Sequence, residues 1–159
     1  VWKLPMVFFL ENNLYGMGTA VGRVHARGGD FDMAGAPYGL DCTVVDGMDV
    51  LAVREATKVA LEKARSGAGP AYIEAKTFRF HGHSVADPVK YRTREEEQEW
   101  RTKDPISHLG DQLLQLDLTT EQELLEIRES QDEVIREAVK FAQESPEPTD
   151  EDLFTDVYA

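Results

Sequence analysis

The chain has 159 residues, of which 42% are apolar and 30% charged, a composition typical of a globular domain with a core and not of a disordered chain. Its formal net charge of -13 argues against a nucleic-acid partner, because duplex binding needs a basic face that neutralises phosphates. Cys42 is the only cysteine, which excludes an internal disulfide and fits a reducing compartment.

The N-terminal sequence suggests a fragment of a longer protein. The chain begins with Val1 and almost at once enters the apolar run of residues 6–10, whereas a domain rarely opens on its most buried-looking strand. No apolar run is long enough to span a bilayer, and no signal-peptide pattern is present, so we expect no membrane partner.

The first half of the chain predicts strands alternating with a helix. We expect a strand at residues 6–10, a glycine-rich loop at 16–39, a strand at 43–45, a helix from 50 to about 65 and a strand at 71–80. The first of these is continuously apolar, which predicts burial on both faces of a parallel sheet. Asp49 suits the N-cap of the helix. This order indicates an α/β fold with a parallel sheet.

The second half predicts helices that open on capping signals. These signals are Thr93 with Glu96, Asp104 with Pro105, and Thr120 with Glu123. The last helix carries an apolar stripe made up of Leu124, Ile127, Val134, Ala138 and Ala142. Such a stripe is more often core packing than an interface, although it could equally face a partner subunit.

The chain is thus expected to have three parts. Residues 1–92 would be the C-terminal part of an α/β domain whose N-terminal part is missing, and 93–145 a helical extension packed on it. Residues 146–159 form an acidic tail, in which Leu153, Phe154, Val157 and Tyr158 could dock on another surface.

Two unusual clusters follow the first and third predicted strands, at the strand ends where open α/β sheets bind ligands. The first covers residues 11–19 (ENNLYGMGT). An asparagine carboxamide is a neutral oxygen ligand suited to Mg²⁺ on a diphosphate, and flanking glycines allow close approach of the backbone. In isolation, however, an Asn-Asn pair more often simply turns the chain.

The second cluster is residues 81–84 (HGHS). Two histidines in a surface loop are usually solvated, and as a metal site they lack a third ligand except Asp87. One imidazole could instead give and take protons near an anionic cofactor.

Together, these motifs resemble the α subunits of thiamine-diphosphate-dependent 2-oxo-acid dehydrogenases. The matching segments are 11–19, 45–49 (VDGMD), 80–84 with Asp87 and Pro88, 91–96 (YRTREE) and 104–106 (DPI). The resemblance spans nearly the whole chain and is densest from residue 2 to 106. It implies that residues 1–92 belong to a thiamine-diphosphate-binding fold, with Mg²⁺ bridging the diphosphate to the protein.

The resemblance also implies roles for individual residues. Asn13 would be the side-chain ligand of Mg²⁺, Tyr15 would offer its backbone carbonyl, and Gly16 would contact the cofactor. His83 would lie beside the cofactor as a catalytic residue, with His81 as a less certain neighbour. The family's other metal ligand is the aspartate of an upstream Gly-Asp-Gly that this chain does not contain, so these residues alone cannot complete the site.

The implied reaction is the oxidative decarboxylation of a 2-oxo acid, with transfer of the acyl group to a lipoyl arm. A β subunit would supply the glutamate that activates the thiamine, in an α₂β₂ tetramer docked on a lipoyl-bearing acyltransferase core. The loop around His83 looks most like the pyruvate branch, because the branched-chain branch usually sets two histidines side by side. Branched-chain 2-oxo acids and acetoin are the alternatives. The expected compartment is a bacterial cytoplasm, or else a plastid stroma or mitochondrial matrix.

Ser84 matches a serine that kinases phosphorylate in mitochondrial relatives and is the regulatory candidate. Ala20 and Lys90 stand where that pattern has two further acceptors, which argues against kinase control. We therefore expect Ser84 to be structural, hydrogen-bonded within its loop, and Arg79 to anchor that loop through an ion pair with Asp87.

Three rival functions remain open. The chain could be a non-catalytic assembly fragment of the same fold, a metal-binding or nucleotide-binding α/β module that uses the His81–His83 loop, or a protein-docking module built on its acidic C-terminal helices.

Overall fold

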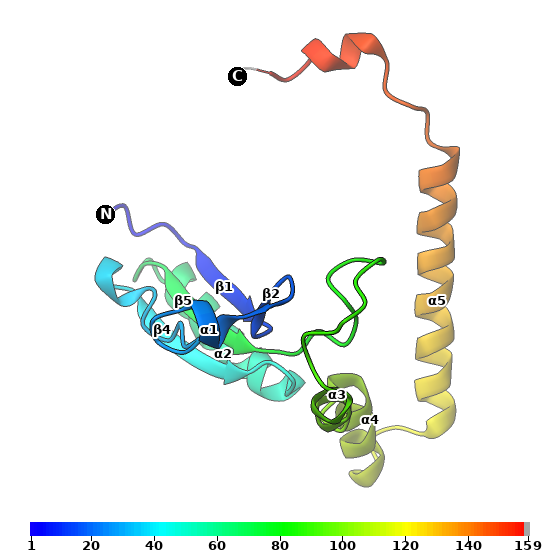
Figure 1. Cartoon of the computed structure of the whole chain (residues 1–159), viewed down its shortest axis with the longest axis horizontal. Coiled ribbons are helices and arrows are strands. Elements are labelled where there is room, and N and C mark those ends of the chain that lie inside the picture. Colours follow the sequence, from blue (N-terminus) through cyan, green and yellow to red (C-terminus); the bar gives the residue numbers. More distant parts are fainter. Residues whose placement is uncertain (158–159) are drawn as a thin grey trace. The chain divides into compact units, whose positions relative to one another are not determined.

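The computed structural model describes residues 1–157, so the predicted docking role of Tyr158 lies outside the described residues (Figure 1). The chain divides into two compact units, one covering Val1–Gln112 and the other beginning at Leu113. Within residues 1–157, no helix is both long and apolar enough to cross a membrane.

The first unit contains a three-stranded parallel sheet. β1 (Val7–Asn12), β5 (Ala71–Lys76) and β4 (Asp41–Asp46) lie side by side in that order, with β5 in the centre. Their register aligns the last residues of all three strands, Asn12 with Lys76 and Lys76 with Asp46. The helix α2 (Val50–Arg65) joins β4 to β5. This arrangement confirms the predicted α/β fold with a parallel sheet.

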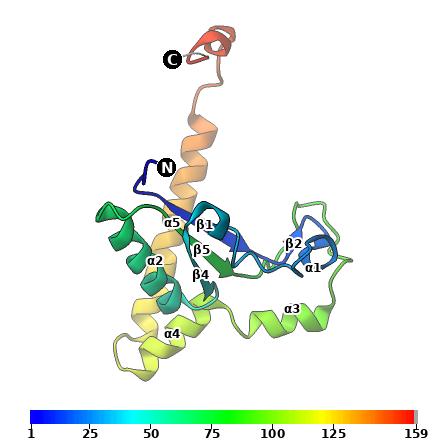
Figure 2. The same cartoon turned by 90° about the vertical axis from the view of Figure 1, so that its left-hand side faces the viewer.

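The core lies between one face of the sheet and α2 (Figure 2). Alternate residues of β5 point into it, and Ile73 and Ala75 are each only 1% exposed. Val45 of β4 and Ala60 of α2 complete this cluster. The helix begins at its predicted N-cap, because the Asp49 carboxylate accepts hydrogen bonds from the amides of Leu51 and Ala52 at 2.9 and 3.0 Å.

Two predictions about the strands are wrong. β1 is not buried on both faces: it lies at the edge of the described sheet, and Phe8 and Phe9 are 44% and 42% exposed. The third strand ends at Lys76 rather than at Phe80. Its neighbours β1 and β4 end at the same level, so residues 78–80 have no strand to pair with.

The glycine-rich segment contains only short elements, as predicted. They are β2 (Tyr15–Gly16), β3 (Thr19–Ala20), the helical turn α1 (Val21–Val24) and the 3₁₀ turn η1 (Ala36–Tyr38). β2 and β3 pair in a small antiparallel hairpin. Part of this segment covers the face of β5 opposite the core, where the Phe31 amide donates a hydrogen bond to the Glu74 carboxylate at 3.0 Å.

The predicted helices are present as α3 (Arg94–Arg101), α4 (Pro105–Gln115) and α5 (Glu121–Glu144), followed by the 3₁₀ turn η2 (Asp150–Phe154). Thr120 and Glu123 form the complete capping box. Thr93 caps α3, but the reciprocal bond from Glu96 is not formed because the Glu96 carboxylate accepts the Tyr15 hydroxyl instead. Within the second unit, the stripe on α5 is left largely uncovered, with Ile127 and Val134 57% and 55% exposed. The domain limits at residues 92 and 145 stay predictions.

Replacing the N-cap of α2 should destabilise the sheet domain. Asp49→Ala removes the acceptor for two amides, and we expect the free energy of unfolding to fall by about 1 kcal/mol. Urea denaturation of the full-length protein measures this change. The control is Glu55→Ala, an exposed side chain on the same helix, and an equal loss in both variants would contradict the capping role.

Candidate functional site

The site is built on the two segments that leave the aligned ends of β1 and β5. After β1, two successive asparagines turn the chain: the side-chain oxygen of Asn12 accepts from the Leu14 amide, and that of Asn13 accepts from the Tyr15 amide, both at 3.1 Å. Leu14 takes a left-handed conformation with φ 68°. Both asparagines therefore do turn the chain, as asparagine commonly does, and the turn leads directly into the β2–β3 hairpin.

Tyr91 packs this hairpin against the loop that follows β5. A Cβ atom added to Gly18 would lie 2.8 Å from the Cδ1 atom of Tyr91, so only glycine allows this close contact. The Tyr15 and Tyr91 rings lie 5.4 Å apart between centroids. The Tyr15 hydroxyl donates to Glu96 at 2.9 Å, and burial together with this bond raises the pKa of Tyr15.

Arg79 joins the same two segments through its guanidinium. Its Nη2 donates to the Met17 carbonyl in the hairpin at 2.7 Å and to the Tyr91 hydroxyl at 2.9 Å. Its Nε donates to the carbonyl of His81 at 3.2 Å. The guanidinium therefore ties together the hairpin, the start of the histidine loop and the tyrosine at the loop's end.

Asp87 organises the inside of the histidine loop. Its carboxylate accepts hydrogen bonds from the His83 amide at 2.7 Å, the Tyr91 hydroxyl at 2.7 Å and the Val89 amide at 2.9 Å. The bond from the His83 amide is the largest cause that lowers the pKa of Asp87 to about 2, followed by the bond from Tyr91. The predicted direct ion pair with Arg79 is wrong, because the Tyr91 hydroxyl stands between them, accepting from Arg79 and donating to Asp87.

Arg92 holds the start of the loop from the interior. It is buried, and its guanidinium donates to the carbonyls of Arg79, Phe80 and His81 while lying 4.8 Å from the centre of the Phe78 ring. These bonds satisfy carbonyls that have no neighbouring strand to pair with. Sequence reasoning assigned no role to Arg92 or Tyr91, although both lie in the segment 91–96 that carries the family resemblance.

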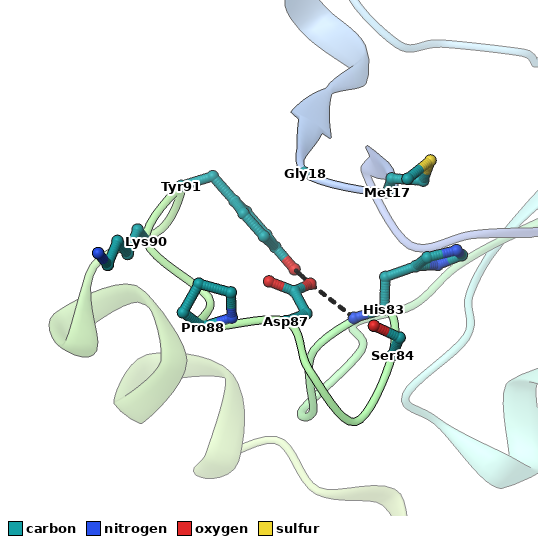
Figure 3. Close-up of a pocket in the computed structure, with 8 residues that line it drawn as sticks. All are labelled: Met17, Gly18, His83, Ser84, Asp87, Pro88, Lys90 and Tyr91. Carbon is teal, nitrogen blue, oxygen red and sulfur yellow. Dashed lines mark hydrogen bonds between the residues drawn. The ribbon is translucent and has the colours of Figure 1, made fainter.

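A pocket of about 420 Å³ opens between the hairpin and the histidine loop (Figure 3). It is lined by Met17, Gly18, His83, Ser84, Asp87, Pro88, Lys90 and Tyr91. The backbone of His83 is fixed by Asp87, while its imidazole ring points away from Asp87 on the Met17 side of the pocket (Figure 3). The structure thus brings the two sequence clusters together through Met17 and Gly18 of the first and His83 of the second.

Four of the predicted site residues, Asn13, Tyr15, Gly16 and His81, do not line this pocket. Asn13 and Tyr15 are half-buried in the turn and hairpin, whereas Gly16 and His81 are exposed. Ser84 is exposed at the pocket, and its carbonyl accepts from the Asp87 amide at 3.1 Å. The expected hydrogen bond of Ser84 within its loop is thus present through the carbonyl, while the Ser84 hydroxyl makes none among residues 1–157.

The oxygen atoms near the asparagine turn fit a small hard cation better than a transition metal. Among residues 1–157 no group of three His, Cys, Asp or Glu side chains could hold a metal ion. The turn offers instead the neutral carboxamide oxygen of Asn13 and backbone carbonyls, which are the kind of ligand that Mg²⁺ takes beside phosphate groups. The donor set therefore fits Mg²⁺ that is held jointly with a diphosphate.

Comparison with known proteins identifies the class of protein. Residues 1–151 match the family model described as dehydrogenase E1 component. The chain therefore belongs to the dehydrogenase E1 component family, and its parallel α/β sheet is consistent with the thiamine-diphosphate-binding fold of that family.

Several curated relatives are similar along the whole chain. A protein of Rhizobium meliloti, named pyruvate dehydrogenase E1 component subunit alpha, is 42% identical over 99% of the chain and 45% of its own length. The testis-specific mitochondrial form from Homo sapiens is 49% identical over 100% of the chain and 41% of its length. The chloroplastic subunit alpha-3 of Oryza sativa is 42% identical over 100% of the chain and 37% of its own length. The chain thus spans less than half the length of these relatives.

Losing the Asp87 charge should free the histidine loop. The pKa of Asp87 is about 2 in the folded protein, against an ordinary value of 3.8. The charged carboxylate therefore stabilises the folded loop above about pH 4, and this stabilisation is lost as the pH falls towards 2. We expect pepsin to cleave the loop of the unmodified protein only near pH 2, and that of Asp87→Asn already at pH 4. Mass spectrometry of the fragments identifies the cut. Asp111→Asn on α4 is the control, and equal protection in Asp87→Asn would contradict the role.

Proposed function

We propose that the chain is the C-terminal part of the α subunit of a thiamine-diphosphate-dependent pyruvate dehydrogenase. The observation that carries the proposal is the pocket at which His83 meets the hairpin that follows the Asn12–Asn13 turn, with both segments joined by Arg79, Tyr91 and Asp87. The names of the similar bacterial, mitochondrial and chloroplastic proteins support the same activity.

Asn13 and Tyr15 would hold Mg²⁺, through the side-chain oxygen and the backbone carbonyl respectively, and Gly16 would contact the diphosphate. The support for this assignment is the neutral oxygen set of the turn and the rigidity given by its two side-chain hydrogen bonds. Thiamine diphosphate, when bound, supplies the carbon nucleophile and electron sink that decarboxylation of a 2-oxo acid requires.

His83 would act as the proton donor and acceptor in the pocket. Its amide is bonded to Asp87 and it lines the pocket, and among residues 1–157 neither ring nitrogen makes a hydrogen bond, so both would be available for proton transfer. His81 is the weaker candidate, because its ring lies outside the pocket lining while its carbonyl is bound by Arg79 and Arg92.

The proposed partners are a β subunit, in an α₂β₂ tetramer, and a lipoyl-bearing acyltransferase core. Exposed apolar side chains along α5, among them Ile127, Val134 and Phe141, support an interface with another subunit. The compartment stays a prediction, with a bacterial cytoplasm first and a plastid stroma or mitochondrial matrix as alternatives.

Ser84 remains a regulatory candidate because its exposed hydroxyl lies in the same short loop as the Asp87 carboxylate. A phosphate there would add about two negative charges close to a group that is already ionised, and repulsion would oppose the closed loop.

Asn13 and His83 should fail in different ways if their proposed roles hold. In the full-length protein co-expressed with its β subunit, Asn13→Ala should raise the Mg²⁺ concentration that gives half-maximal activity by about tenfold or more, as for other lost metal-site contacts. His83→Ala should lower kcat by about 100-fold or more without that shift, as for a lost general acid–base group.

His81→Ala is the matched control for His83→Ala and should retain most of the activity. Equal kcat losses in the two variants would contradict the assignment of proton transfer to His83. An unchanged magnesium requirement in Asn13→Ala would remove Asn13 from the metal site.

The substrate is tested by offering the same assembled protein pyruvate, 3-methyl-2-oxobutanoate and acetoin with an artificial electron acceptor. We expect the highest kcat/KM with pyruvate, since the His81–His83 loop resembles the pyruvate branch. A higher value with the branched acid or with acetoin would assign the chain to that branch, and no turnover of any of the three would favour the non-catalytic alternative.

A further inference from the structure

Glu74 is a fully buried carboxylate that the proposed reaction does not use. It lies on the central strand β5, is 0% exposed, and points to the sheet face opposite the apolar core. Its Oε1 accepts a hydrogen bond from the Asn12 side-chain amide at 2.7 Å, and its Oε2 accepts one from the Phe31 amide at 3.0 Å. Burial of a carboxylate is costly unless hydrogen bonds compensate it, and here each oxygen accepts one.

Asn12 uses its whole carboxamide in this network. Its Nδ2 donates to Glu74 and to the carbonyl of Gly29 at 2.8 Å, and its Oδ1 accepts from the Leu14 amide. The side chain is only 4% exposed. The Nδ2 group of Asn12 donates to the sheet and to the loop, so its Oδ1 atom must point to the turn. The orientation of this side-chain amide is therefore fixed.

The two neighbouring asparagines therefore have different tasks. Asn12 is buried, with its side-chain amide held between the sheet, the loop and the turn, so it is not accessible to a metal ion. Asn13, one residue on, is half-buried and bonds only to the turn that Asn12 holds in place. The position of the Asn13 oxygen thus depends on a chain of bonds that begins at Glu74.

We propose that Glu74, acting through Asn12, is a positioning residue that sets the Asn13–Tyr15 turn in the geometry needed to bind Mg²⁺ with thiamine diphosphate. This inference rests on the proposed function of Asn13 as a metal ligand. It requires the carboxylate form in particular: both partners of Glu74 are donors, so a carboxamide at this position must turn its own NH₂ group towards one of them.

A purely structural role for Glu74 would be to fasten the loop at residues 28–32 to the sheet. The chain offers a matched control for that role, because Lys76 on the same face of β5 forms an ion pair with Asp30 in the same loop. Lys76→Met removes one anchor of the loop and leaves both partners of each Asn12 side-chain bond in place. The two variants therefore separate anchoring of the loop from positioning of the turn.

The test uses the full-length protein assembled with its β subunit. Calorimetric titration with thiamine diphosphate at a series of Mg²⁺ concentrations gives the Mg²⁺ concentration for half-maximal binding. We expect Glu74→Gln to raise it about tenfold, within the range seen when residues supporting a metal ligand are replaced. Lys76→Met and the exposed Glu55→Gln should leave it within about twofold, well below that range.

A double substitution gives a second measurement that general destabilisation would not mimic. Asn12→Asp places a carboxylate against Glu74 and should weaken binding at least as much as Glu74→Gln. Adding Glu74→Gln to Asn12→Asp should recover part of the loss, because the carboxamide introduced on β5 can donate to the new carboxylate and still accept from the Phe31 amide. Additive losses in the double variant would overturn the inference.

Amide hydrogen exchange without Mg²⁺ or cofactor gives a readout independent of activity and of loading. Glu74→Gln should speed exchange at Leu14 and Tyr15, whereas Lys76→Met should not. Normal binding by the unmodified protein with no change in Glu74→Gln, or equal effects of Glu74→Gln and Lys76→Met, would overturn this inference alone. Failure of the unmodified protein to bind thiamine diphosphate would overturn the proposed function, and the inference with it.

Discussion

The parallel pairing of β1 with β5 is the constraint on which the rest of the site depends. Six residues of each strand are in register, so the backbone of β1 ends at Asn12 beside the end of β5 at Lys76. The asparagine turn and the histidine loop are about 70 positions apart in the sequence, yet both leave the sheet at this edge. Because side chains alternate along a strand, a shift of one residue would turn Glu74 into the apolar core and release both Asn12 and Phe31.

Charged side chains form different kinds of hydrogen bond in the sheet and in the histidine loop. On the sheet, the buried Glu74 carboxylate accepts hydrogen bonds from two amide groups, the side chain of Asn12 and the backbone of Phe31, and these bonds order the turn. In the loop, the guanidinium groups of Arg79 and Arg92 bind backbone carbonyls, and the Asp87 carboxylate binds backbone amides and a phenol. The loop is therefore closed by hydrogen bonds from charged groups to neutral ones, which are about twice as strong as neutral pairs and do not depend on a surface ion pair.

The sequence was a good guide wherever one local signal decides the structure. The Asp49 cap, the Thr120–Glu123 capping box and the parallel βαβ order all follow from short-range patterns, and all are present. Predictions that depended on distant partners did worse. The pairing of Arg79 with Asp87 was wrong because the Tyr91 hydroxyl fits between them, and no spacing rule reveals that. The half-formed capping box at Thr93 has the same cause, since Glu96 is taken by Tyr15, which is 81 positions away.

The candidate site shows why residue type alone could not separate Asn12 from Asn13. Both are asparagines in one turn, and both accept an amide two positions on at 3.1 Å. What separates them is the donor side of the Asn12 carboxamide, whose two partners lie on a central strand and in a loop far along the chain. Mg²⁺ requires nearly ideal octahedral geometry and tolerates little displacement of its ligands. A turn that contributes one side-chain oxygen to such an ion binds it best when the turn is already rigid in the absence of the ion. The buried hydrogen bonds of Asn12 supply that rigidity.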